Sequence, residues 1–237
     1  MRTFSALRDK CSYPEILELT RVRYAGQQKA LDRGTAFHRA VEQWVKGEQI
    51  DMPTDPDVVA WLDRMTSTWT PPPGIRSEFA VGIRPDGSVT DEVDEPEPHV
   101  YVARDGSELL TAGRLDLTWD ADRVAHVVDV KTGVKYLGSP WSIPQITAQA
   151  YCIAMLSMCG GADHVKAGVF YARLGVFDFG ATRPIQDAHA IFPRIVRWAT
   201  QSAAPVISGA CLSCYSSKAC DAYSKHLAHA GPACENT

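Results

Sequence analysis

Apolar side chains recur at helical spacing in the first third of the chain. Phe37, Val41 and Trp44 form one stripe within residues 12–46, and a second helix is predicted over 56–69. Three consecutive prolines and a glycine follow the second helix and end it. The chain therefore opens with a helical part, which we assign to residues 1–70.

The middle of the chain changes to the pattern of β-strands. Residues 85–99 are acidic and rich in proline and turn residues, so we expect a surface loop or hairpin there. A turn at Asp120, Ala121 and Asp122 joins two of the strands into a hairpin. The strands are predicted at 77–83, 100–104, 109–119 and 124–131.

The second half alternates between helix and strand. A buried helix is predicted over 142–158, two strands over 165–173 and 176–182, and a helix over 185–202. This order indicates an α/β or α+β fold with a mixed central β-sheet flanked by helices. We assign the folded core to residues 76–202.

Composition and charge narrow the class of protein. The 237 residues are 45% hydrophobic, enough to bury one sizeable core, so we expect a single domain over 1–237 with a Cys-rich tail at 203–237. The formal net charge is −4, so a nucleic-acid partner would need a local basic groove or metal ions. The sequence contains no apolar stretch of membrane-spanning length and no secretory signal, so we expect a cytoplasmic protein with no membrane contact.

An acidic and lysine pattern on two consecutive strands suggests chemistry. Asp129 and Lys131 point to one face of their strand and Val128 to the other, while Asp116 on the preceding strand can approach Asp129. Carboxylates suit Mg²⁺ or Mn²⁺, which lower the pKa of a bound water and neutralise charge on a phosphate. A lysine beside them can position that water. The alternative is an ordinary cross-strand ion pair on a solvated hairpin.

In their order, these motifs resemble the RecB-like exonuclease branch of the PD-(D/E)XK nuclease superfamily. Gly34-Thr-Ala-Phe-His38 resembles a Gly-x-x-x-His helix motif whose histidine binds metal. Gly113-Arg-Leu-Asp116 and Asp129-Val-Lys-Thr-Gly133 resemble the aspartate and D-x-K-T-G motifs. The resemblance implies a restriction-endonuclease-like fold. It also implies metal ligation by His38, Asp116, Asp129, the Val130 carbonyl and Glu78, and catalysis by Asp116, Asp129, Lys131 and Gln145.

A helix motif of the form Q-x-x-x-Y follows the lysine in that family. Gln145 matches its glutamine, but Gln149 stands where tyrosine is expected and Tyr151 lies two residues further on. The residue of this helix that contacts DNA is therefore Gln149 or Tyr151, of which we select Tyr151. Arg114 is the second predicted DNA contact.

Seven cysteines in a reducing compartment favour metal or cluster ligation over disulfides. Cys211, Cys214 and Cys220 form C-x2-C-x5-C, and Cys11 is the only cysteine upstream of the predicted metal motifs. This arrangement resembles the iron–sulfur subgroup of CRISPR-associated and phage RecB-like exonucleases and the AddB nuclease domain. The resemblance implies that the four cysteines bind a 4Fe–4S cluster that closes the tail on Cys11, with zinc as the competing occupant.

Further basic and aromatic residues were considered for DNA binding, beside the equally open interpretation of a mixed solvated surface and core. They are Arg21, Arg23, Lys29, Arg33, Lys135, Lys166, Tyr136 and Trp141. Cys152 and Cys159 are expected to be inert core thiols, whereas Cys234 and His226 are not expected to bind the cluster.

The resemblance implies a Mg²⁺- or Mn²⁺-dependent DNA exonuclease acting on DNA ends or single strands, in recombination, DNA processing or CRISPR adaptation. It implies a prokaryotic or phage-encoded protein that acts beside recombination or CRISPR-integration proteins, alone or as an oligomer. A second hypothesis is a catalytically weak DNA-binding or assembly subunit with the same fold. A third is a zinc-stabilised α/β domain with no nuclease role.

Overall fold

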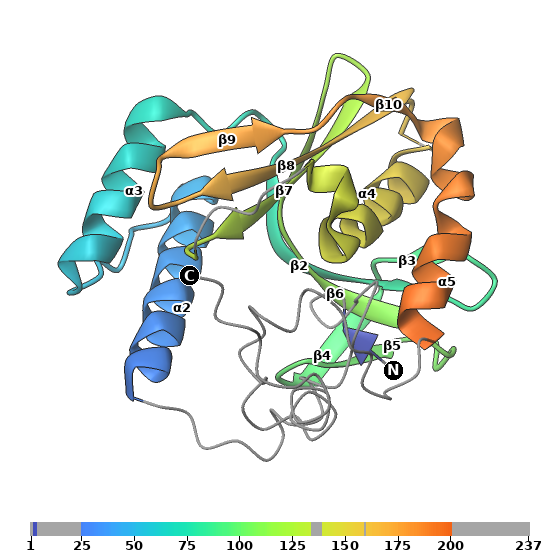
Figure 1. Ribbon diagram of the computed structural model, residues 1–237, viewed down its shortest axis with the longest axis horizontal. Helices are drawn as coiled ribbons and strands as arrows, with labels where there is room; N and C mark the ends of the chain where they lie inside the picture. The colour runs from blue at the N-terminus through green and yellow to red at the C-terminus, as the bar shows by residue number, and fades with distance from the viewer. Residues whose placement is uncertain (1, 4–24, 134–138, 159, 201–237) are drawn as a thin grey trace, which may run out of the picture.

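The computed structural model describes residues 2–3, 25–133, 139–158 and 160–200 (Figure 1), with side chains described from residue 28 onward. The predicted cysteine ligands Cys11, Cys211, Cys214 and Cys220 lie outside the described residues. Within the described residues no helix is long and apolar enough to cross a membrane.

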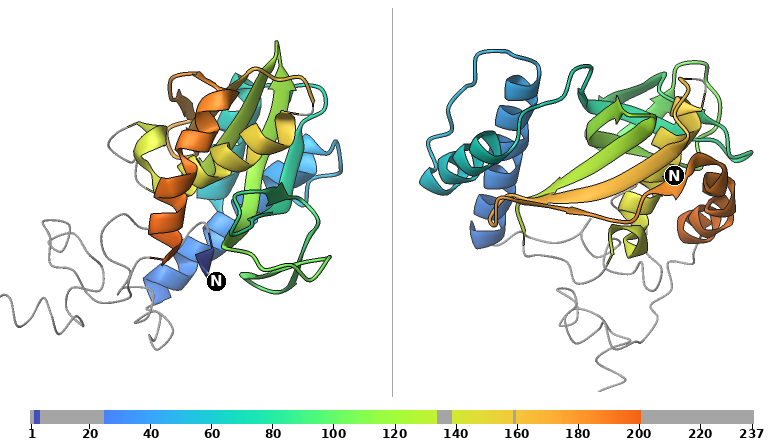
Figure 2. Two further views of the ribbon diagram at one scale, coloured as in Figure 1. Left: turned by 90° about the vertical axis from the view of Figure 1, so that its right-hand side faces the viewer. Right: turned by 90° about the horizontal axis from the view of Figure 1, so that it is seen from above.

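A mixed β-sheet lies between two helical layers, with α2 and α3 on one face and α4 and α5 on the other (Figure 2). The helices are α2 (Ala25–Val45), α3 (Pro56–Thr68), η2 (Pro140–Ser142), α4 (Pro144–Ser157), η3 (Ile185–Ala190) and α5 (Phe192–Thr200). The strands are β1 (Arg2–Thr3), β2 (Arg76–Ile83), β3 (Val89–Thr90), β4 (Val93–Glu97), β5 (Val100–Ala103), β6 (Thr111–Ala121), β7 (Val124–Lys131), β8 (His164–Tyr171), β9 (Val176–Phe179) and β10 (Arg183–Pro184). The predicted α/β class with a mixed central sheet is confirmed.

The order of the main sheet is β10-β8-β7-β6-β2-β3, with β1 beside β6 and β9 beside β8. The strands β2, β6 and β7 are antiparallel neighbours, whereas β7 and β8 are parallel. The parallel pair requires a crossover, which α4 supplies on one face of the sheet. The β6–β7 hairpin turns at Asp122 and Arg123, both with positive φ, as a two-residue hairpin turn requires.

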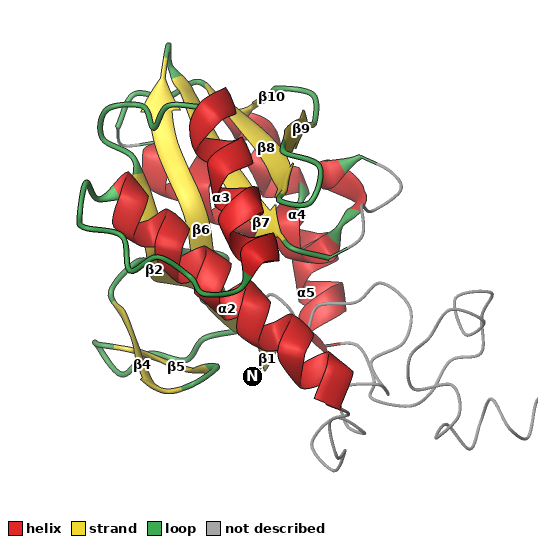
Figure 3. Ribbon diagram, turned by 90° about the vertical axis from the view of Figure 1, so that its left-hand side faces the viewer, coloured by secondary structure: helices red, strands yellow, loops and turns green. Residues whose placement is uncertain are grey.

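Helices α2 and α3 together cover one face of the sheet (Figure 3). They pack on it through aromatic and aliphatic side chains. Helix α3 begins where the Asp55 side chain accepts a hydrogen bond from the Asp57 N–H, and Pro56 occupies its first turn. Its buried residues recur at helical spacing. They are Val58, Trp61, Leu62 and Met65. On the sheet side this core includes Val128 and Val130, as the strand alternation predicted.

Helix α4 covers the opposite face and is buried on almost every side over Ile146–Ala154. The underlying strands contribute Ala125, Val127 and Val165 to this core, and α5 adds Ile195 and Trp198. Asp129 has the same strand parity as Ala125 and Val127, so it faces α4. The sheet therefore directs the acidic and lysine residues of β7 toward α4, and directs its valines toward α2.

Two predicted elements differ from the structure. The predicted loop 85–99 contains β3 and β4, and β4 pairs with β5 in a separate two-stranded sheet. The predicted helix 185–202 is divided into η3 and α5. Pro193, which has no backbone N–H to donate, stands at the second position of α5, where such a donor is not needed.

Candidate metal centre

The candidate site lies where β6 and β7 separate. They pair only as far as Leu117 and Val128, although β7 stays paired with β8 through Lys131. Beyond this point the Val130 N–H donates to Asp116 Oδ2 at 2.6 Å, and the Val130 carbonyl lies 3.1 Å from His38 Nε2. Side chains of the site thus satisfy backbone groups that the sheet leaves unpaired. This connection fixes Asp116 and His38 against the end of β7.

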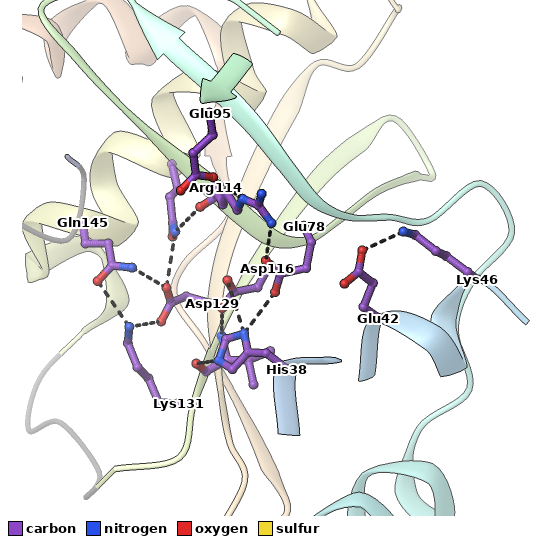
Figure 4. Close-up of polar contacts among 12 residues, drawn as sticks. His38, Glu42, Lys46, Glu78, Glu95, Arg114, Asp116, Asp129, Lys131 and Gln145 are labelled. Carbon is purple, nitrogen blue, oxygen red and sulfur yellow. Dashed lines mark hydrogen bonds and ion pairs between the residues drawn. The ribbon is translucent and has the colours of Figure 1, made fainter. Parts of the chain in front are cut away.

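Three residues from α2, β2 and β6 converge beside this opening (Figure 4). His38 Nδ1 lies 3.0 Å from Glu78 Oε1 and 3.8 Å from Asp116 Oδ1. One ligand atom from each of the three residues lies within 4.8 Å of the others. One imidazole nitrogen and two carboxylates at such distances can share a single metal ion. The combination suits Mn²⁺, which accepts nitrogen as well as oxygen ligands, and its carboxylates suit Mg²⁺.

Glu78 occupies a strained position in β2. Its φ of +51° is unusual for a residue with a side chain, and it lies in the ladder opposite Asp116, between the pairs Ser77–Leu117 and Phe79–Leu115. Such backbone strain costs about 1–3 kcal/mol and persists where the surrounding structure enforces it. Here it brings the carboxylate next to His38 and Asp116.

Asp129, Lys131 and Gln145 form a second, connected network on the α4 side of the opening (Figure 4). Lys131 Nζ lies 2.8 Å from Asp129 Oδ2 and 3.2 Å from Gln145 Oε1. Gln145 Nε2 donates to Asp129 Oδ1 at 2.7 Å. Asp129 is 1% exposed, so its charge is held by these partners and not by water. Gln145 therefore orients both Lys131 and Asp129.

Gln149 completes this network from one turn further along α4. Its Nε2 lies 3.3 Å from both Asp129 Oδ1 and the Arg114 carbonyl, and its side chain is fully buried. The Arg114 carbonyl belongs to the part of β6 that no longer pairs with β7. Gln149 thus bridges the separated strands and supports Asp129 from within the core.

The electrostatics of the three-residue cluster favour a cation. Burial alone would lower the pKa of His38, but Asp116 and Glu78 outweigh it and raise the pKa to about 9. Burial and the nearby carboxylates of Asp129 and Glu78 raise the pKa of Asp116, against the opposing effect of His38. Several carboxylates share this small volume, so a bound cation would relieve their mutual repulsion. The residues present fit a divalent metal in donor type and charge.

The two-stranded β4–β5 sheet holds Arg114 beside the His38–Glu78–Asp116 cluster. Arg114 Nε donates to Glu95 Oε2 at 2.6 Å, and its Nη1 lies 4.0 Å from Glu78 Oε2. Arg114 is half exposed, so it borders the site without closing it. Glu95 was not predicted as part of the site, because its contact depends on β4 and β5, within and beside a predicted loop.

The other predicted DNA contacts are distributed less closely around the site. Tyr151 is buried and donates its hydroxyl to the Gly87 carbonyl, so the structure does not bring it to the three candidate metal ligands. Trp141 is also buried, and its Nε1 donates to the Ala181 carbonyl. Lys166 lies over the Phe179 ring at 4.8 Å. Cys152 is a free, buried thiol within the core, as expected. Arg21, Arg23, Lys135, Tyr136, Cys159, His226 and Cys234 lie outside the described residues.

The site thus combines an acid–lysine pair on one strand of a mixed sheet with a His38–Glu78–Asp116 cluster that could hold a metal ion. A family model for the PD-(D/E)XK nuclease superfamily matches residues 12–222. The match covers most of the chain, so the protein belongs to this superfamily. A search of curated proteins gave no match.

Proposed function

We propose that the protein is a Mg²⁺- or Mn²⁺-dependent deoxyribonuclease that acts as an exonuclease on DNA ends or single strands. The observation that carries the proposal is the junction of the two networks at one end of β7. Metal-type ligands lie on one side of Val130, and the Asp129–Lys131–Gln145 network lies on the other. Membership of a nuclease superfamily supports the same class of reaction.

Each residue has a role that its contacts support. His38, Glu78 and Asp116, which converge in the structure, would hold the metal. By resemblance to the family, Asp129 and the Val130 carbonyl would be further ligands. A bound divalent cation supplies a water of lowered pKa and neutralises charge that develops on the phosphate. Lys131, oriented by Asp129 and Gln145, would hold its ammonium toward that water and the phosphate oxygens. Arg114, at the border of the site, would contact a phosphate.

The test is degradation of end-labelled single- and double-stranded DNA in Mn²⁺ or Mg²⁺ by protein purified without oxygen. Wild-type protein should degrade DNA only with metal, and the labelled end gives the polarity. Lys131→Ala should abolish degradation, whereas Arg197→Ala, which removes an exposed cation of α5, should retain it. Metal-dependent cleavage that survives loss of both Asp129 and Lys131 would identify a contaminant. A folded, metal-binding but inactive wild type would favour the DNA-binding subunit hypothesis.

We also propose that Cys11, Cys211, Cys214 and Cys220 bind a 4Fe–4S cluster, with zinc as the lesser alternative. The C-x2-C-x5-C spacing supports three soft ligands close together, and Cys11 supplies the fourth. Iron, sulfide and zinc analysis of anaerobically purified protein distinguishes the occupants. A cluster gives four irons and four sulfides per chain, and their absence alongside one zinc would contradict it.

The place of such an enzyme in DNA processing follows from its substrate. An exonuclease that acts on ends or single strands would trim DNA for recombination, repair or CRISPR adaptation, in a prokaryotic or phage setting. Its partners would then be recombination or integration proteins, and the protein could act alone or as an oligomer. Pull-down with tagged wild-type protein from its source cells, beside Lys131→Ala as a trapping variant, tests these associations.

A further inference from the structure

A basic pocket of about 260 Å³ lies outside the candidate metal centre, between α2, α3 and the end of β7. This volume is below the range of about 300–1,000 Å³ that is usual for drug-sized ligands, so the pocket suits a small group. It is lined by the cations Lys29, Arg33 and Arg173, by Trp61, and by Thr132 and Gly133. The last two residues directly follow Lys131 in the chain.

Two of the three cations are available for an anion. Arg33 lies 2.8 Å from both Asp55 and Asp57, so its charge is already balanced. Arg173 uses Nε to donate to the Thr132 carbonyl at 2.8 Å, which leaves the other guanidinium N–H groups for a ligand. Across the part of the chain that the structure describes, neither Lys29 nor Arg173 pairs with a carboxylate.

The aromatic wall of the pocket is not a stacking platform for a base. Trp61 is 6% exposed and packs in the core, with the Arg173 guanidinium 5.6 Å from its ring centre. A nucleobase would need an open ring face to stack on. The chemistry of the pocket therefore fits a singly charged, oxygen-rich group, and a phosphodiester is such a group.

The pocket is placed along α2 in line with the metal centre. Ala30, Gly34 and His38 lie one helical turn apart on the same side of α2. Ala30 lines the pocket, Gly34 lies against Thr132 and His38 belongs to the metal cluster. Eight residues of α-helix span about 12 Å. At an axial rise of about 3.4 Å per nucleotide, the two sites are about four nucleotides apart or fewer.

We propose that the pocket formed by Lys29 and Arg173 binds a backbone phosphate of the DNA strand whose scissile phosphate lies at the metal centre. The inference rests on the proposed nuclease function and adds a fixed point to the path of the strand. Lys29 contributes a charge, and Arg173, held against Thr132, contributes directed N–H donors. The pocket thus sets the register of the strand against Lys131 without reading its sequence.

The test is equilibrium binding of single-stranded oligonucleotides in which one linkage at a time is an uncharged methylphosphonate. The proteins carry Lys131→Ala, so that the DNA is not cut, and Mn²⁺ is present. In protein with Lys29 intact, neutralising one particular linkage, within about four of the cleavage position, should weaken binding about threefold to tenfold. Lys29→Ala should weaken binding to unmodified DNA by the same factor, and should make binding insensitive to that linkage.

Controls separate the pocket from general charge effects. Arg197→Ala removes an exposed cation from α5 and should leave the dependence of binding on the neutral linkage unchanged. Lys29→Arg, which keeps the charge, should show the same dependence as the protein with Lys29. Lys29→Ala should also lower the slope of log Kd against log salt concentration by about 0.7. If Lys29→Ala weakens binding equally at every linkage, or not at all, the pocket proposal is overturned. DNA hydrolysis by the wild type is measured separately, because its absence would overturn the proposed function as well.

Discussion

At the scale of single residues, Asp129 shows how a buried charge is prepared for chemistry. It lies almost entirely inside the protein, with Lys131 on one oxygen and Gln145 and Gln149 on the other. A buried carboxylate without such partners would tend to become neutral. Two glutamines one turn apart on α4 therefore donate to the same carboxylate. Both are neutral, so they stabilise its charge without adding another charge to the core.

Replacing Gln149 by Met should lower both stability and turnover. The change leaves the Arg114 carbonyl without this donor and removes one hydrogen bond from Asp129, at a cost of about 1–3 kcal/mol. We expect kcat to fall on the order of tenfold to a hundredfold with little change in KM, because Asp129 and Lys131 lose their fixed geometry. Chemical denaturation and steady-state kinetics measure the two effects. Gln186→Met, at an exposed position, is the control, and an unchanged kcat in Gln149→Met would refute the positioning role.

The stability of the metal-free protein should depend on pH through His38. Its pKa is raised from 6.5 to about 9 by Asp116 and Glu78, against the effect of burial, so the folded state keeps a proton that the unfolded chain releases. The stabilising contribution is complete below pH 6.5 and is lost as the pH rises through about 9. In EDTA, the difference in unfolding free energy between wild type and His38→Gln should shrink over that range. A pH-independent difference for His38→Gln would contradict the assignment.

Short motifs made several residues of the site predictable. The D-x-K alternation placed Asp129 and Lys131 on one face, and the early helix motif identified His38. The structure brings these residues together with Asp116, Glu78, Gln145 and the Val130 carbonyl. Gln149 could not be assigned in the same way, because its contacts depend on the separation of β6 from β7. That separation leaves no local pattern in the sequence.

At the scale of elements, the bounds of helices and strands were predictable where one face is buried. Helix α3 and strand β7 have a clear apolar periodicity, and their predicted and observed bounds differ by at most one residue. Strand β4 has a single apolar residue and a proline, so its sequence resembles a loop, whereas the apolar β5 was predicted as a strand. The pairing of β4 with β5 becomes visible only with Tyr101, Ala103 and Leu109 packed together in a separate cluster.

The short helix η2 shows why an aromatic residue after the lysine motif need not contact DNA. Trp141 packs between α4 and the β8–β9 layer, and Gly180 lies so close to its ring that no side chain would fit there. Trp141→Ala should therefore cost about 3–5 kcal/mol of stability, and Trp141→Phe distinctly less. Below the unfolding transition, the Kd of Trp141→Phe for single-stranded DNA should equal that of the wild type. Normal stability of Trp141→Ala together with weakened DNA binding would instead support base stacking.

At the scale of the whole molecule, the two ends of the described chain lie near each other. Strand β1 pairs with β6 at Thr111 and Ala112, and Figures 1 and 2 place it beside the last turn of α5. Cys11 follows β1 by eight residues, and Cys211 follows α5 by eleven. At about 3.3–3.6 Å per residue, the first segment reaches at most about 26–29 Å and the second about 36–40 Å. The positions of both anchors are thus compatible with one cluster that joins Cys11 to the tail.

Such a cluster would cross-link nearly the full length of the chain, so its loss should lower the stability of the whole domain. Cys220→Ala should remove the bound iron and lower the unfolding free energy by about 2–5 kcal/mol, as expected for a cross-link that closes a long loop. Cys234→Ala, which removes a tail cysteine outside the proposed set, should change neither quantity. Iron analysis and denaturant unfolding under anaerobic conditions measure both. The metal ligands and Lys131 come from α2 and the central sheet, so we expect folded Cys220→Ala to retain Lys131-dependent cleavage at low temperature. Loss of iron without loss of stability would show that the cluster does not hold the chain ends.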